Sequence, residues 1–299
     1  MTYTANEFHG IYRGKKYHDE DFDSVLSRAE EYGCQKMILT TMTLTGAQQN
    51  LEVCRKYPSK CYMTLGIHPY HAADISSDSD TLQSLTQLRK TLSAQSPSPL
   101  VAFGEIGLDY FYLNKASKES QTRAFVAQLE LATTFSLPLF LHIRDAYADF
   151  VSLITPFLSR LPKRGIVHSF AGTKDEMLGL VNMGFDISVN GVSFRTEEQL
   201  EMVRAIPLER LQLETDAPWC EIPATGLEQY LVDAKPLPPS RKHGKFVKGE
   251  MVKGRNESCT IERVARIVAG VKGLSVEAVA EAAWANSVGM FGLHKMLRS

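Results

Sequence analysis

Short apolar runs alternate with longer amphipathic segments along most of this chain. In segments such as residues 117–135 and 146–158, apolar side chains recur every three or four positions, which is the period of a helix. Regular alternation of apolar strands and helices predicts parallel strands that are joined by right-handed crossovers. The expected strands are residues 36–41, 61–68, 101–108, 137–143, 165–170, 185–190 and 211–216.

Most of these runs end on or next to a histidine or an acidic residue, and five such positions stand out: His68, Glu105, His142, His168 and Asp216. In a (β/α)₈ barrel the ends of successive strands meet on one face, and the functional residues sit there. A doubly wound sheet would instead show one switch point and a glycine-rich first turn, and this chain lacks that turn. The pattern therefore predicts an α/β fold of the TIM (β/α)₈-like barrel type, as a single domain over residues 1–299.

The first strand of this barrel is expected to be degenerate or missing. Seven strands are visible where eight are needed, and the residues before the first expected helix, near 19–32, are polar and interrupted by glycine. After Asp216 no further strand is evident, and two helices are expected near residues 259–269 and 276–290.

Composition agrees with a globular protein. Of 299 residues, 44% are apolar and 22% are charged, with 33 Lys and Arg against 34 Asp and Glu. No run approaches the roughly 18 apolar residues of a membrane-spanning helix, and no apolar leader opens the chain. The five scattered cysteines are typical of reduced thiols. We therefore expect a cytoplasmic or nuclear protein with no membrane contact, and we favour a monomer although the sequence does not fix the oligomeric state.

A divalent metal site is the first chemical hypothesis. A buried strand tolerates charge poorly unless that charge is paired or bound to a metal. Four of the residues at strand ends, Glu105, His142, His168 and Asp216, supply two carboxylates and two imidazoles. This ligand set suits Zn²⁺, Mn²⁺ or Mg²⁺.

Other residues on the same rim are candidates for substrate contact. His68 is a candidate metal ligand, general acid or phosphate contact, and the sequence does not choose among these three roles. Arg144 follows His142 by two residues and so points to the same side, where it binds a phosphate or carboxylate or forms a structural salt bridge. Asp109 is expected to orient a ligand, and Glu214 to be buried one layer deeper.

A basic segment follows the last strand and is expected on the face that carries the chemistry. Residues 235–255 contain seven Lys and Arg against one acid, Glu250. This segment is either a clamp for a phosphate backbone or a solvated loop. On the first reading Arg241, Lys242 and Lys245 bind substrate.

Five ordered motifs resemble the TatD-type deoxyribonucleases, metal-dependent hydrolases of the barrel amidohydrolase superfamily. They are GIHP (66–69), GEIGLD (104–109), LHIRDA (141–146), VHSFAGT (167–173) and ETDAPW (214–219), and the likeness covers about residues 8–293. Three shorter strings look like the eukaryotic branch of the family, namely GIYRG (10–14), NG (190–191) and RNES-C (255–259).

The resemblance implies roles for individual residues. It makes Glu105 a metal ligand able to bridge two ions, His142 and His168 ligands of one ion, and Asp216 a ligand and the general base. His68 lies near the scissile phosphate. The implied activity is hydrolysis of DNA phosphodiester bonds, in a 3′–5′ exonuclease or an endonuclease mode, with one or two divalent ions per chain, Mg²⁺ first and Mn²⁺ or Zn²⁺ as alternatives.

The chain departs from the family pattern at its start. Family members begin with a strand that ends in an H-x-H pair, or in a weaker D-x-x-x-N version of it, just before the segment matching GIYRG. Here only Glu7-x-His9 has a spacing like that of the H-x-H pair. A second metal site is therefore in doubt. Two other functions remain: a metal-dependent amidohydrolase or aminoacyl-tRNA deacylase with a similar site, and a catalytically weakened barrel that binds nucleic acid.

Overall fold

Seven parallel strands form one curled sheet in the computed structural model, which describes residues 1–76 and 80–293. Their order in the sheet follows their order in the chain, from β3 to β9. This confirms the expected TIM-like barrel and all seven expected strands. The strands are β3 (Met37–Leu39), β4 (Cys61–Leu65), β5 (Leu100–Asp109), β6 (Leu139–Arg144), β7 (Gly165–Val167), β8 (Asp186–Val189) and β9 (Leu211–Leu213).

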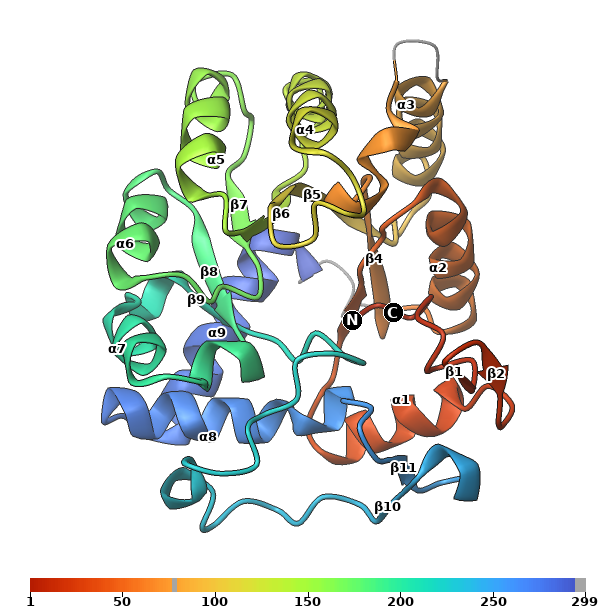
Figure 1. The fold of residues 1–299 in the computed structure, drawn as a ribbon, viewed down its shortest axis with the longest axis vertical. Helices are drawn as coiled ribbons and strands as arrows, with labels where there is room; N and C mark the ends of the chain where they lie inside the picture. Colours follow the sequence, from red (N-terminus) through yellow and green to blue (C-terminus); the bar gives the residue numbers. More distant parts are fainter. Residues whose placement is uncertain (77–79, 294–299) are drawn as a thin grey trace.

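Helices surround the sheet, as Figure 1 shows: α2 to α7 follow one another around its outside, and α8 and α1 complete the ring. The α-helices are α1 (Phe22–Glu31), α2 (Leu44–Lys56), α3 (Thr81–Ser93), α4 (Lys118–Ala132), α5 (Tyr147–Ile154), α6 (Lys174–Asn182), α7 (Glu197–Ala205), α8 (Ile261–Lys272) and α9 (Val276–Phe291). Short 3₁₀ turns are η1 (Pro69–Asp74), η2 (Thr155–Phe157), η3 (Gly191–Phe194), η4 (Leu208–Arg210), η5 (Glu228–Tyr230), η6 (His243–Lys245) and η7 (Ser258–Thr260). No helix in these ranges is both long and apolar enough to cross a membrane.

Local sequence signals set the ends of several helices. The Thr173 hydroxyl accepts a hydrogen bond from the Glu176 amide, and the Glu176 side chain accepts one from the Thr173 amide, so α6 begins with a capping box. Thr196 and Gln199 repeat this arrangement at α7. At the other end of a helix, Gly273 terminates α8 at φ +67°, a left-handed conformation that glycine adopts without steric cost.

The bottom of the barrel is closed by α9. Its Val288 and Phe291 pack with Phe140 of β6 and Ile166 of β7, whose side chains are buried. Side chains alternate along a strand, so His142 and Arg144 share the inward face of β6 with Phe140. The Phe140 ring stacks on His168 at a centroid distance of 4.7 Å. Apolar packing therefore supports the polar layer above it.

The sheet has two free edges, because β3 and β9 do not pair with each other. The first two residues lie between these edges: the Thr40 amide donates to the Met1 carbonyl (2.8 Å), and the Thr2 amide donates to the Ala217 carbonyl (2.8 Å). No regular eighth strand is present in the described residues, as expected from the sequence. Two small sheets lie outside the barrel, β1 (Ile11–Tyr12) with β2 (Lys15–Lys16), and β10 (Ser240–Arg241) with β11 (Met251–Val252).

A buried ion network joins α1 to the segment before α8. The guanidinium of Arg255 is fully buried and donates to Asp21 (2.6 Å) and to Glu257 (2.8 Å). Arg28 donates to the same Glu257 at 2.7 Å. Arg255 belongs to the basic segment of the sequence, but the structure removes it from the surface because its charge is paired in the interior.

Candidate metal centre

Three imidazoles converge on one carboxylate oxygen at the carboxyl ends of the central strands. The Oε1 atom of Glu105 lies 2.6 Å from Nε2 of His168, 2.8 Å from Nδ1 of His142 and 3.2 Å from Nε2 of His68. Burial by itself raises the pKa of the Glu105 carboxyl, but the charge of His168 and the hydrogen bonds of His142 and His168 lower it well below the usual value. Glu105 is thus held ionised at the centre of the site.

The donor atoms of Glu105, His142 and His168 lie close enough together to share one ion. His142 Nδ1 and His168 Nε2 lie 3.3 Å apart, which closes a triangle with the two shorter distances to Glu105. Neighbouring ligands of an ion bound at about 2.1 Å lie roughly 3.0–3.4 Å apart. The two imidazole nitrogens lie in this range, whereas their distances to Glu105 are those of hydrogen bonds, so an ion bound here would separate Glu105 from the two rings by a few tenths of an ångström. The ligand atoms of His68, Glu105 and His142 also lie within 4.8 Å of one another.

Asp109 orients His142, as the sequence indicated. Its Oδ2 lies 3.0 Å from Nε2 of His142 and also accepts a hydrogen bond from the Tyr70 hydroxyl at 3.0 Å. With Nε2 held by this carboxylate, Nδ1 is the ring nitrogen that faces Glu105. Burial lowers the pKa of His142, but hydrogen bonds to Asp109 and Glu105 outweigh burial and raise it. The carboxylate–imidazole pair is a common support for a metal ligand.

Glu214 plays the corresponding part for His168. Its Oε2 lies 3.5 Å from Nδ1 of His168, while its Oε1 accepts hydrogen bonds from the Ser169 amide and from the Ser188 hydroxyl (2.9 Å). Burial lowers the pKa of His168, but the charges of Glu105 and Glu214 raise it well above the usual value. Glu214 therefore lies beside the ring of His168 and holds the loop that follows β7, but it is only partly buried, whereas the sequence predicted a buried position one layer deeper.

His68 is set apart from the other two histidines by its hydrogen bonds. Its Nδ1 accepts a hydrogen bond from the Tyr70 amide at 3.1 Å. Burial lowers the pKa of His68 more than the charge of Glu105 raises it. The ring is therefore neutral with its proton on Nε2, which points at Glu105. A protonated nitrogen cannot bind a metal, so we assign His68 as a hydrogen-bond donor in the site and not as a ligand, although its spacing alone would allow either.

Asp216 lies in the same cleft, but it is not the last residue of a strand. The strand expected over 211–216 ends at Leu213, and Asp216 has φ +48°, a left-handed conformation that no strand residue adopts. Its Oδ2 accepts a hydrogen bond from the Cys220 thiol at 3.2 Å. Burial, together with the charge of Glu214, raises the pKa of Asp216 to about 6. This is a suitable value for a group that accepts a proton near neutral pH.

One open cleft of about 1140 Å³ is lined by His68, Glu105, His142, His168 and Asp216. Four non-glycine residues of the cleft have positive φ, and such strained conformations concentrate at functional sites: Asp145, Ser169, Asp216 and Cys220. Arg144 lines the cleft wall as expected, with its guanidinium carbon 4.0 Å from the centre of the Phe111 ring. The cleft therefore combines the buried imidazoles and carboxylates with a positive charge on its wall.

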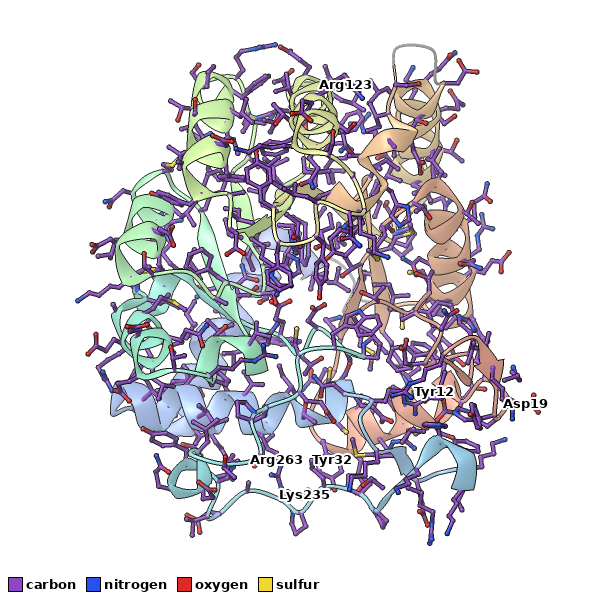
Figure 2. The ribbon with its side chains drawn as sticks, viewed as in Figure 1. Tyr12, Asp19, Tyr32, Arg123, Lys235 and Arg263 are labelled. Atoms are coloured by element: carbon purple, nitrogen blue, oxygen red, sulfur yellow. The ribbon has the colours of Figure 1, made fainter. Side chains whose placement is uncertain are left out.

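The basic segment does not line this cleft. Figure 1 shows it passing along the outer edge of the molecule, beside α8 and α1. Lys235 lies over the ring of Tyr32 in the turn after α1 at 4.0 Å (Figure 2). Arg241 pairs with Glu250 at 2.5 Å. The sequence placed this segment beside the metal site, whereas it packs against α1 and the β1–β2 hairpin, so Lys242 and Lys245 can reach only a substrate that extends beyond the cleft.

His9 and Glu7 do not replace the missing pair of ligands. His9 lines a separate cavity of about 360 Å³ and lies 3.3 Å from Glu20. Next to β3, the cleft wall is formed by Thr2 and Met42, which offer neither an imidazole nor a carboxylate. Among the described residues, this part of the cleft wall therefore offers no second set of metal ligands.

Sequence reasoning missed the aromatic residues of the cleft. Phe111 and Tyr112 follow β5, Tyr70 follows His68, and Trp219 follows the Asp216 motif. Only Tyr70 and Trp219 could have been predicted from the sequence, because Tyr70 stands close to His68 and Trp219 close to Asp216. The loop that carries Phe111 has no periodicity from which its position could be read.

Known proteins similar to this chain agree with the geometry. The family described as "TatD related DNase" matches residues 9–292. "Deoxyribonuclease Tat-D" of Schizosaccharomyces pombe is 41% identical over 95% of this chain and 91% of its own length. "3'-5' ssDNA/RNA exonuclease TatD" of Erwinia billingiae is 36% identical over 92% and 94%. The crystal structure of an uncharacterized amidohydrolase from Saccharomyces cerevisiae superposes with a TM-score of 0.91 at 32% identity, over 97% of this chain and 98% of that chain. The chain belongs to the TatD-related DNase family.

Proposed function

We propose that this TatD-family hydrolase cleaves DNA phosphodiester bonds with the help of one divalent metal ion. A single observation carries the proposal: Glu105 faces two imidazoles, and each imidazole has a carboxylate on its far side, Asp109 at 3.0 Å from His142 and Glu214 at 3.5 Å from His168. Such pairs keep ligands in place for a metal, whereas a purely structural polar cluster has no need of them.

The ion would be held by Glu105, His142 and His168, with Asp216 completing the set. When bound, a divalent ion lowers the pKa of a coordinated water and neutralises charge on the phosphate. Family resemblance implies Mg²⁺, while two imidazoles suit Mn²⁺ and Zn²⁺ well. Because His142 and His168 have raised pKa values, protons compete with the ion for both rings, and the affinity for the ion falls as the pH is lowered.

Two residues of the chain act on the reacting groups. The Asp216 carboxylate accepts a proton from the attacking water, whose oxygen bonds to phosphorus as one phosphorus–oxygen ester bond breaks, and the departing oxygen takes up a proton from Asp216 or from solvent water. His68 donates a hydrogen bond from Nε2 to a phosphate oxygen. It is too poor an acid to release that proton, because its ring is already neutral. Arg144 at the cleft mouth binds a phosphate of the substrate.

Longer substrates would also contact the basic segment. Arg241, Lys242 and Lys245 lie outside the cleft, so they bind phosphates away from the scissile bond. DNA is the expected substrate, as the name of the fission yeast relative states for that protein. We expect the chain to act as a monomer in the cytosol or the nucleus, where its five unpaired cysteines stay reduced.

Digestion of end-labelled linear DNA and of circular DNA tests the proposal, with Mg²⁺, Mn²⁺ and Zn²⁺ titrated separately. We expect cleavage that depends on the ion and is lost in His142→Ala and Asp216→Ala. Loss of label from linear DNA with intact circles indicates an exonuclease, and nicked circles indicate an endonuclease. Cleavage that both variants retain in full, or hydrolysis of model esters without any cleavage of DNA, would overturn the proposal.

A further inference from the structure

Aromatic side chains surround the mouth of the cleft and stay unusually exposed. Phe111 is 56% exposed, Trp219 is 47% exposed and Tyr112 is 37% exposed, and all three line the cleft. Phe111 and Tyr112 follow β5, whereas Trp219 follows β9 at the far edge of the curled sheet. Exposed aromatic rings that border a site indicate contact with a ligand, because the fold gains nothing from leaving them in water.

The loop that carries Phe111 and Tyr112 is tied to the metal centre through Asp109. The carboxylate that orients His142 through Oδ2 also accepts a hydrogen bond from the Tyr112 amide through Oδ1, at 3.0 Å. The Tyr70 ring packs edge-on against Tyr112 at 5.5 Å, and its hydroxyl donates to Asp109. The position of the aromatic loop is therefore fixed relative to the reacting groups.

Positive charge accompanies the aromatic surface. The Arg144 guanidinium lies 4.0 Å from the centre of the Phe111 ring and 5.1 Å from that of Tyr112. Lys115 and Arg195 also line the cleft and are exposed. Within the described ranges none of these three cations forms an ion pair with a carboxylate. Flat aromatic faces beside unpaired cations match a chain in which bases alternate with phosphates.

We propose that Phe111, Tyr112 and Trp219 form a base-stacking platform that selects unpaired nucleotides at the cleft. Bases inside a duplex are already stacked and paired, so only an unpaired base offers a free face to these rings. Stacking is available to every base, so the platform selects for strandedness and not for sequence. The inference rests on the proposed nuclease function and adds the residues that discriminate single strands from duplexes.

Intrinsic fluorescence provides a test that does not depend on cleavage. The chain has two tryptophans, and Trp284 is an exposed residue of α9 outside the cleft, so Trp284→Phe leaves Trp219 as the only reporter. The probe is a short oligothymidylate with phosphorothioate linkages, added in the presence of chelator. We expect it to quench Trp219. An oligonucleotide of the same length and charge with abasic residues at its 3′ end should quench less and bind roughly 5- to 150-fold more weakly.

Kinetics of variants provide the second test. Phe111→Leu should raise KM for single-stranded DNA by roughly 5- to 150-fold with little change in kcat, and Phe111→Tyr should restore it, because only the aromatic face is lost and regained. For a blunt duplex the effect of Phe111→Leu should be small. Leu113→Ala is the matched control, because Leu113 is 45% exposed on the same loop but does not line the cleft.

The outcomes separate this inference from the function on which it rests. If the wild-type protein neither binds nor cleaves any DNA, the proposed function fails. If it cleaves DNA while Phe111→Leu keeps its KM and abasic ends quench Trp219 as strongly as normal ones, only the stacking platform is refuted.

Discussion

Asp109 and His142 form the pair that gives the metal centre its orientation: Oδ2 of the carboxylate lies 3.0 Å from Nε2 of the ring, whose other nitrogen lies 2.8 Å from Glu105. The same carboxylate holds Tyr70 and the Tyr112 amide. One buried acid therefore connects a metal ligand to the wall of the cleft. We expect a substitution of Asp109 to affect metal binding more than any other property of the site.

Asp109→Asn should weaken metal binding by about 10- to 100-fold, because the amide no longer holds His142 in the ligand orientation. Activity should return towards the wild-type kcat at saturating metal. Calorimetric titration with Mn²⁺ and the metal dependence of DNA cleavage measure both effects. Asp149→Asn is the control, since Asp149 pairs on the surface with Lys118. Identical metal dependence in Asp109→Asn and the wild type would contradict the orienting role.

Asp216→Asn should stabilise the metal-free protein. Burial raises the pKa of this carboxyl to about 6 from an unfolded value of 3.8, so the folded state binds the extra proton and stability falls as the pH rises from about 4 through 6. At pH 7 the loss is about 2–3 kcal/mol, which the neutral amide avoids. Urea unfolding in chelator across this pH range measures the difference.

With saturating metal the wild type should be more stable than Asp216→Asn. The carboxylate of Asp216 strengthens metal binding to the folded state, and the amide of the variant does not. The exposed Asp233 provides the control variant Asp233→Asn, which should unfold like the wild type at every pH. If Asp216→Asn leaves the pH dependence of unfolding unchanged in chelator, the charge of Asp216 does not oppose folding.

Arg255→Met should destabilise the protein by about 3–5 kcal/mol, because it leaves the carboxylates of Asp21 and Glu257 buried with too little positive charge. The exposed pair of Arg160 with Glu130 gives a matched comparison, and Arg160→Met should cost no more than about 1 kcal/mol. Denaturant unfolding of both variants checks the contrast, and equal losses would refute a special role for the buried network.

Replacing Lys242 and Lys245 together by alanine should weaken binding of long DNA and lower the slope of log Kd against log salt by about 2, one unit for each lost phosphate contact. Oligonucleotides short enough to stay in the cleft should bind as before. Lys90 and Lys163 are exposed on other parts of the surface, and their double alanine variant is the control. An equal loss for short and long DNA would show that the basic segment acts indirectly.

The residues at the strand ends are predictable because the alternation of side chains along a strand and the order of the strands in the chain decide where they lie. Alternation along β6 is enough to put Phe140, His142 and Arg144 on one face of the strand. Chain order then puts the ends of the parallel strands on one rim. The expected orienting role of Asp109 follows from its distance in sequence to Glu105, and the contact with His142 confirms it.

The positions of loop residues cannot be predicted in this way, because loop sequences have no hydrophobic periodicity. The basic segment was expected beside the metal site, yet it packs on α1, held in part by Lys235 over Tyr32. Asp216 was expected on a strand, but its positive φ places it in the turn after β9. In both places side-chain partners from distant parts of the chain decide the conformation.

By itself, the sequence determined seven strand–helix units with polar residues at their ends, because hydrophobic periodicity and chain order are local properties. The tertiary structure decided which atoms meet. The tautomer of His68 depends on the Tyr70 amide, the burial of Arg255 depends on Asp21, and the aromatic mouth of the cleft joins loops from β5 and β9. These contacts depend on three-dimensional proximity between segments far apart in the chain, which no pattern along the sequence records.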